Sequence, residues 1–351
     1  MAAEAAFRMR KALTNLVVLI GGLLVFGAVA EGGLRLAGRR PERPVVPVFS
    51  WTGKGEFWLL EPGENSRTRV GNHPVQVNAL GLRDREIGPC DPSEQRVLFL
   101  GDSVTYGHGQ AAETTFAREV ERLLTGSGRA VRVINAGIPG WSTRQELAFY
   151  REHGRALCAE LVLVGFVLND VNELKRGLVE IGAERSLAAT RAVTWLATHS
   201  AAFALVKEAY VTALDPASRE IGAVQELVRR ADAPEVQRAM QLVEDDLLAL
   251  AALAREHGAR IGLVLFPFRF QLEDAQLDAP QARLRTFGAR NDVPVLDTIP
   301  VLRRHEPDDV LMDQDHFTAL GHRVVGQAVA EWVRRERLLA ATDTPQHPSM
   351  P

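Results

Sequence analysis

The chain has 351 residues, 46% of them hydrophobic, which is enough for one large domain or two smaller ones with a substantial core. The formal net charge is −3 at pH 7, and basic residues are interspersed with acidic ones. This balance provides no electrostatic basis for binding nucleic acid, so we expect no nucleic-acid partner.

Residues 1–35 are expected to form an N-terminal membrane anchor or an export signal. No charged residue occurs from Ala12 to Ala30, and a helix of this length spans about 28 Å, close to the hydrocarbon thickness of a bilayer. We therefore predict one transmembrane helix. The small residues 28–30 leave a cleaved signal peptide as the alternative, and a buried helix is a third interpretation. Basic residues flank the segment on both sides, so the positive-inside rule does not decide its orientation.

Residues 36–95 are predicted to form a tether and small appended strands, and we assign no chemistry to them. The proline-rich run 41–47 is typical of an extended spacer, and the alternation at 75–78 predicts a short strand. Cys90 lies in a polar loop and Cys158 just before an apolar run. We expect two unpaired thiols, with a disulfide as the alternative.

Alternating strand and helix patterns predict a parallel sheet flanked by helices over residues 96–340. The predicted strands are the apolar runs at 97–100, 131–134, 161–168, 260–267 and 293–297. The segment from about residue 171 to residue 257 is rich in Ala and Leu, and it is too long for a single crossover connection between two strands. We interpret them as a helical insertion that forms a lid or a substrate wall, with packing helices on the sheet as the alternative. Residues 341–351 are expected to be a disordered tail.

The first predicted strand ends at Gly101-Asp102-Ser103, and ligands bind at the carboxyl ends of strands in open α/β sheets. Ser103 is therefore the candidate nucleophile, with a turn residue as the alternative. Serine needs a base within hydrogen-bond reach, and His316 is the candidate because imidazole titrates near neutral pH. Asp313, three residues earlier, can reach the His316 ring and orient it, and Asp315 is the alternative partner.

Acyl transfer also needs hydrogen-bond donors for the oxyanion of the tetrahedral intermediate. The backbone N–H groups of Ser103 and of a glycine in the loop 137–140, together with the side-chain amide of Asn169, provide three candidates. A helix cap is the alternative role of Asn169. His108 either lines the pocket or faces solvent, and His322 is predicted to lie on a helix surface. No zinc spacing, nucleotide-binding loop or Gly-x-Ser-x-Gly elbow occurs in the sequence, so we predict no metal and no cofactor.

Together these segments resemble the SGNH/GDSL hydrolase family. Gly101-Asp102-Ser103 resembles the first block of the family, Gly137-Ile138-Pro139-Gly140 the second, Asn169-Asp170 the third and Asp313-Gln314-Asp315-His316 the last. The resemblance covers about residues 97–330 without the helical segment. It implies a three-layer, flavodoxin-like fold with a parallel sheet, the SGNH hydrolase fold.

The resemblance also implies roles for individual residues. It assigns the nucleophile to Ser103, the base to His316 and the orienting carboxylate to Asp313. Gly140 and Asn169 are the implied oxyanion donors, together with the backbone N–H of Ser103. Gly137 is the alternative to Gly140. The family often has a glycine two residues before the asparagine, where this chain has Val167, and this departure affects the expected shape of the third loop.

We therefore predict a membrane-tethered serine esterase whose catalytic domain lies outside the cytoplasm, as similar anchored members of the family imply. Its substrate is expected to be a short acyl ester, such as an O-acetyl group on an envelope or exported glycan. The protein would be secreted if the N-terminal segment is cleaved. Three alternatives are an acyltransferase supplied by a multi-span acyl-donor partner, a lipase or lysophospholipase, and an inert glycan-binding domain of the same fold.

Overall fold

The structure is a computed structural model, and the residues that it describes are 2–39, 41, 49–51, 56–67, 73–125, 130–171, 192–193, 195–197, 199–214 and 216–339. Three predicted features lie outside these residues. They are the tail at 341–351, most of the tether at 41–47, and positions 172–191 of the helical insertion.

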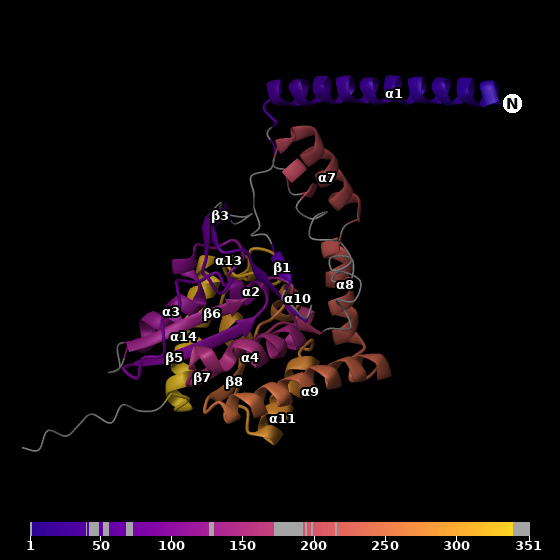
Figure 1. Cartoon of the computed structure of the whole chain (residues 1–351). Coiled ribbons are helices and arrows are strands. Elements are labelled where there is room, and N and C mark those ends of the chain that lie inside the picture. Colours follow the sequence, from indigo (N-terminus) through magenta and orange to yellow (C-terminus); the bar gives the residue numbers. More distant parts are fainter. Residues whose placement is uncertain are drawn as a thin grey trace, which may run out of the picture. The chain divides into compact units, whose positions relative to one another are not determined.

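The chain divides into two compact units. The first consists of Met1–Pro44 and Arg185–Pro216, and it contains the helices α1 (Ala2–Leu36) and α7 (Ala201–Leu214), which contact each other (Figure 1). In the part of the chain that the structure describes, no helix has both the length and the apolar character needed to cross a membrane. The transmembrane helix predicted for the start of the chain is therefore not supported.

The second unit, Val45–Glu184 with Ala217–Pro351, is built on a five-stranded parallel sheet, as predicted. In the order in which they pair, its strands are β6 (Ala130–Gly137), β5 (Glu94–Gly101), β7 (Leu161–Phe166), β8 (Arg260–Leu265) and β9 (Val295–Asp297). This is the doubly wound order of flavodoxin-like folds. The central strands β5 and β7 are almost wholly buried, which explains their continuous apolar sequences.

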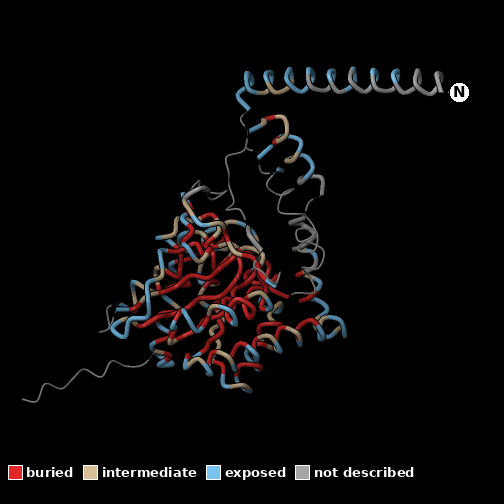
Figure 2. Tube along the Cα trace, in the orientation of Figure 1, coloured by how far each residue is buried: buried red, intermediate tan, exposed pale blue. Residues whose placement is uncertain are grey.

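Helices cover both faces of this sheet and make three layers (Figure 1). On one face α3 (Phe116–Leu124) packs against α14 (Ala319–Arg335). On the other face α9 (Pro234–Glu256) packs against α4 (Thr143–Leu157) and α11 (Ala279–Asn291). Figure 2 shows the buried strands between these helices. Because α9 also packs on β8, the last part of the segment interpreted as an insertion is a packing helix on the sheet.

Further strands and helices complete the second unit. Two antiparallel pairs precede the sheet: β1 (Phe49–Trp51) with β2 (Trp58–Leu60), and β3 (Gly63–Arg67) with β4 (Pro74–Val77), which confirms the short strand predicted at 75–78. The other helices for which the structure gives bounds are α2 (Ser103–Tyr106), η1 (Ala112–Thr114), η3 (Leu168–Asp170), α8 (Pro216–Arg229), α10 (Arg269–Glu273), α12 (Ile299–Leu302) and α13 (Pro307–Val310).

Cys90 and Cys158 form a disulfide with a Cα–Cα distance of 5.9 Å, so the prediction of two unpaired thiols is wrong. Cys158 ends α4 in a left-handed conformation, with φ of 53°, directly before β7. Cys90 lies in the loop before β5, and β5 pairs with β7. Adjacent parallel strands begin at the same edge of a sheet, so the two loops meet there although 68 positions separate the cysteines.

Candidate active site

The predicted site residues come from loops at the carboxyl edge of the sheet. Gly101, the last residue of β5, is paired with Gly137 of β6 and with Gly165 of β7, so the three strands end at nearly the same level. Ser103 follows the first strand and Asn169 the third. When neighbouring parallel strands end at the same edge of a sheet, the residues that follow them lie around one shared crevice.

Ser103 is the first residue of the short helix α2. The carboxylate of Asp102 accepts a hydrogen bond from the backbone N–H of Val104 at 2.9 Å and caps this helix. A side chain at Gly137 would collide with the backbone of Thr105 and Tyr106, so glycine is required where the second loop passes α2. The close approach of these two loops keeps the Ser103 hydroxyl beside the loop 137–140.

Ser103, His316 and Asp313 form a continuous hydrogen-bonded series. Ser103 Oγ lies 2.8 Å from His316 Nε2, and His316 Nδ1 lies 3.0 and 2.9 Å from the two carboxylate oxygens of Asp313. Asp313 Oδ1 also accepts the backbone N–H of His316 at 2.9 Å, so the three-residue spacing closes a tight turn. An acceptor-only carboxylate places the imidazole proton on Nδ1 and leaves Nε2 free to accept the serine proton.

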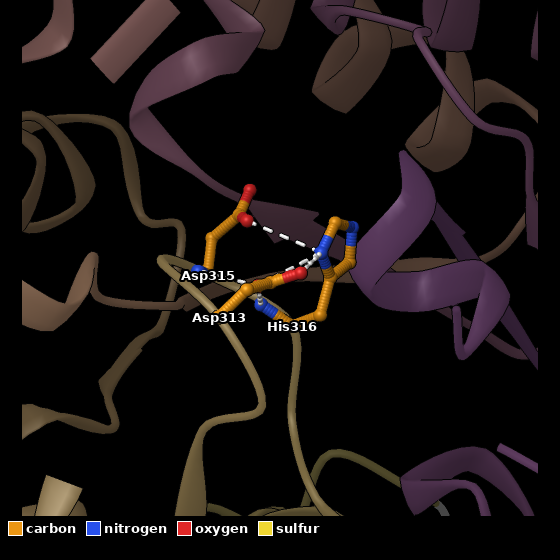
Figure 3. A group of neighbouring side chains, drawn as sticks. All are labelled: Asp313, Asp315 and His316. Carbon is orange, nitrogen blue, oxygen red and sulfur yellow. Dashed lines mark hydrogen bonds and ion pairs between the residues drawn. The ribbon is translucent and has the colours of Figure 1, made fainter. Parts of the chain in front are cut away.

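A second carboxylate faces the same imidazole nitrogen. Figure 3 shows the carboxylates of Asp313 and Asp315 directed at the same ring nitrogen of His316, with Asp315 Oδ1 at 3.3 Å from Nδ1. The other oxygen of Asp315 accepts a hydrogen bond from the Asn169 amide at 3.4 Å. The possible ligand atoms of Asp313, Asp315 and His316 lie within 4.8 Å of one another, close enough to hold a cation, but His316 Nδ1 already binds the carboxylates.

The charge around His316 sets its titration. Burial alone lowers the pKa of His316, but the charge of Asp315, the hydrogen bond and charge of Asp313, and the charge of Asp102 outweigh it and raise this pKa to about 9. Burial raises the pKa of Asp313, and the hydrogen bonds and charge of His316 bring it well below the usual range of an aspartate. The imidazolium is therefore strongly stabilised.

A cavity of about 360 Å³ opens beside Ser103 Oγ. Its lining residues are Ser103, His108, Pro139, Gly140, Asn169, Ile221, Phe268, Asp313, Gln314, Asp315 and His316. The residues of three candidate oxyanion donors, Ser103, Gly140 and Asn169, thus line the cavity. Gly137 is not among the lining residues, and its N–H already donates to Asn135 Oδ1 at 2.9 Å. Gly140 has a φ of +85°, a conformation that favours glycine, and is the better-placed donor of the two.

His108 and His322, the two other histidines named in the sequence analysis, differ in their surroundings. His108 lines the cavity, and its ring centroid lies 4.5 Å from that of His316, so the pocket interpretation holds for this residue. His322 is buried, and its Nδ1 accepts the backbone N–H of Phe116 at 3.1 Å. The prediction that His322 lies on a helix surface is therefore wrong, because this face of α14 packs on α3. Burial, with the charges of Arg83 and His316, lowers the pKa of His322 to about 3.

Two arginines without a predicted role hold the loops that carry the site. Buried Arg83, from the segment before the sheet, donates to the carbonyls of Tyr106, Gly107 and Gln110 at 3.1, 2.9 and 2.6 Å. The guanidinium of Arg269, the first residue of α10, donates to the carbonyls of Leu311 and Asp313 at 3.1 and 3.0 Å, and the backbone N–H of Arg269 donates to the carbonyl of Gln314 at 2.6 Å. No local sequence motif indicates the role of either arginine, because each donates hydrogen bonds to backbone carbonyls of segments that are distant in the sequence.

Two tryptophans hold the loop 137–140 in a similar way. The Trp58 indole N–H donates to the carbonyl of Pro139 at 3.3 Å, and the Trp141 indole N–H donates to the carbonyl of Trp58 at 3.0 Å. Trp58 belongs to β2, in the segment to which the sequence analysis assigned no chemistry. That segment therefore supports both the chain that follows Ser103, through Arg83, and the loop 137–140, through Trp58.

A serine, an imidazole and a carboxylate in series at the edge of a parallel α/β sheet define a site of the serine-hydrolase type. The model of the GDSL-like lipase/acylhydrolase family matches residues 99–324, and the chain belongs to this family. It is accordingly a hydrolase of the GDSL esterase class. The segment that holds Arg83 and Trp58 precedes the matched region.

Solved structures resemble the chain at low identity. A putative lipolytic protein of the G-D-S-L family from Desulfitobacterium hafniense DCB-2 is 10% identical, covering 68% of this chain and 99% of its own, with a TM-score of 0.42. TesA is 15% identical, with 70% of this chain and 100% of TesA covered and a TM-score of 0.44. A catalytic mutant of the acetylxylan esterase Axe2 from Geobacillus stearothermophilus is 16% identical over 68% and 94%, with a TM-score of 0.43. No curated protein matches the chain.

The raised pKa of His316 predicts an alkaline activity profile. The base must be neutral to accept the serine proton, so kcat/KM should rise about tenfold per pH unit below a pKa of about 9 and level off above it. Initial rates on a chromogenic acetate ester, corrected for spontaneous hydrolysis, measure this profile. Circular dichroism at each pH controls for unfolding, and a plateau already reached at neutral pH would contradict the expectation.

The contact between Trp58 and Pro139 predicts a role in turnover. Replacing Trp58 with Phe removes the indole donor and keeps an aromatic ring, so kcat should fall about fivefold with little change in KM, the effect of one hydrogen bond of about 1 kcal/mol. Trp195→Phe is the matched control, because Trp195 is 59% exposed and lies in the other unit. Equal kinetics in both variants would show that the Trp58 donor does not position the loop.

Proposed function

We propose that this hydrolase cleaves short acyl esters, with O-acetyl groups of an envelope or exported glycan as the substrate class. The observation that carries the proposal is the unbroken series from Ser103 Oγ through His316 to Asp313 beside an open cavity. The family supports ester hydrolysis, and the cavity supports a small acyl group.

In the proposed mechanism, Ser103 Oγ attacks the ester carbonyl while its proton passes to His316 Nε2. The N–H groups of Ser103 and Gly140 and the Asn169 amide stabilise the oxyanion. When the tetrahedral intermediate collapses, the C–O bond to the alcohol breaks and the alcohol takes the proton from His316. A water molecule then attacks the acyl-serine with His316 again as base, which releases the carboxylic acid and restores the serine.

The lining of the cavity supports a small acyl group on a polar alcohol. Pro139, Ile221 and Phe268 provide apolar surface, whereas His108 and Gln314 provide polar groups that can bind hydroxyls. A volume of about 360 Å³ is near the lower end of small-molecule sites, which measure roughly 300 to 1,000 Å³. Ile221 belongs to α8, so the predicted insertion contributes to the wall of the cavity.

Replacing Ser103 with Ala should reduce hydrolysis of p-nitrophenyl acetate by at least about 10⁴-fold, because the nucleophile is lost. The variant should keep the wild-type circular dichroism spectrum and lose labelling by a fluorophosphonate. Ser93→Ala, at a turn outside the cavity, is the matched control. Activity or labelling that survives in Ser103→Ala would reject the mechanism, and a folded wild type that takes no label would favour an inert glycan-binding domain.

The size of the cavity predicts a preference for short acyl chains. Across p-nitrophenyl esters from acetate to decanoate, kcat/KM should be highest for acetate or butyrate and fall by at least about tenfold at decanoate. Release of acetate from an O-acetylated glycan then tests the substrate class. A maximum at long chains would favour a lipase, and acylated sugar as the main product would favour an acyltransferase.

We also propose that the catalytic unit acts outside the cytoplasm. The uncharged segment Ala12–Ala30 supports export, and so does the Cys90–Cys158 disulfide, since disulfides persist in oxidising compartments. The enzyme should be found in an extracytoplasmic fraction, membrane-bound or released, without thiols that react with maleimide before reduction. Reactive thiols and retention in the cytoplasmic fraction would contradict the proposal.

A further inference from the structure

Asp315 bridges two parts of the site that the mechanism treats as separate. One carboxylate oxygen lies 3.3 Å from His316 Nδ1, and the other accepts the Asn169 side-chain amide at 3.4 Å. His316 lies in the same loop as Asp315, whereas Asn169 lies in another loop, 146 positions before Asp315. A single side chain thus contacts both the proposed general base and a proposed oxyanion donor.

Asp315 lies farther from His316 Nδ1 than Asp313 does, but its burial strengthens its electrostatic effect on the imidazole. Asp313 has the shorter distances to His316, but its side chain is 48% exposed, whereas that of Asp315 is 11% exposed. Water screens an exposed charge more effectively than a buried one, so the field of Asp315 at the imidazole is less attenuated. The hydrogen-bond geometry of His316 is therefore set mainly by Asp313, and a large part of its charge stabilisation by Asp315.

The contact with Asn169 has a separate consequence. An amide side chain can present either its oxygen or its NH₂ group to the cavity, and only the NH₂ group stabilises an oxyanion. A carboxylate accepts hydrogen bonds and does not donate them, so Asp315 selects the rotamer in which Asn169 Nδ2 faces the site. An NH₂ group carries two hydrogens, so the bond to Asp315 does not exhaust the donors that this amide can offer an oxyanion.

We propose that Asp315 is a positioning residue with two roles in this site: it stabilises the protonated form of His316 as a second carboxylate, and it orients the Asn169 amide toward the oxyanion. This inference rests on the proposed function, because it takes His316 as the base. Among the described residues, the other ionisable groups that act on or lie beside the imidazole include Asp313 in the same loop, Asp102 after β5, His108 in the loop after α2 and buried His322 of α14.

Two substitutions separate the roles. Asp315→Asn removes the charge but keeps an oxygen that can accept from Asn169, so the apparent pKa of kcat/KM should fall by about one unit and kcat on the alkaline plateau by only about threefold, the effect of a weaker base. Asp315→Ala removes charge and acceptor, so the same shift should come with about a tenfold loss of plateau kcat and little change in KM. Asp309→Asn, an exposed carboxylate on α13, is the charge-matched control.

A second comparison tests the shared action on His316 Nδ1. Asp313→Ala should keep at least about ten times the activity of Asp313→Ala/Asp315→Ala, because Asp315 still stabilises the imidazolium. Equal activity of the two, or an unshifted profile in both Asp315 variants, would overturn the inference.

The titration of His316 can be read without any substrate. In ¹⁵N-histidine NMR, the signal assigned to His316 by its absence in His316→Ala should titrate about one pH unit lower in Asp315→Asn than in wild type. An unchanged titration overturns the inference about Asp315. A shifted titration in an enzyme that hydrolyses no ester supports that inference while the proposed function fails, so the two failures are distinguishable.

Discussion

The structure of the site depends on one contact, the hydrogen bond between Ser103 Oγ and His316 Nε2, which joins residues 213 positions apart. Such a contact works only if both loops are held to within a few tenths of an ångström. The parallel sheet provides the coarse alignment, because β5, β6 and β7 end at one level and their following loops leave from one edge. The finer alignment comes from side chains outside the catalytic series.

These supporting side chains bind backbone carbonyls. Arg83 holds the chain after the nucleophile, Arg269 holds the loop of Asp313 and His316, and Trp58 holds the loop of Gly140. A guanidinium has five donors in a rigid plane and can satisfy several carbonyls of an irregular loop at once. Buried carbonyls need such partners, so the same contacts that stabilise the loops also fix the catalytic geometry.

The same site concentrates negative charge around one imidazole. Asp313, Asp315 and Asp102 together outweigh the effect of burial and raise the pKa of His316, which favours the imidazolium. In the proposed mechanism His316 takes this form once Ser103 has given up its proton. The same charges would then stabilise the imidazolium during attack and reduce the fraction of neutral base at low pH.

The amino-acid sequence alone determined the parallel sheet, and it predicted both the sheet edge at which the candidate site lies and the grouping of Ser103, His316 and Asp313 there. These features are local: apolar runs predict buried strands, and Asp313 is three residues from His316, close enough to be joined by one turn. Only the tertiary structure decided that Asp315 contacts Asn169, that Cys90 meets Cys158, that His322 is buried, and that Arg83 and Trp58 hold the catalytic loops. Each of these depends on which distant segments become neighbours, and a pattern within one segment carries no information about the surface that a later segment will bring against it.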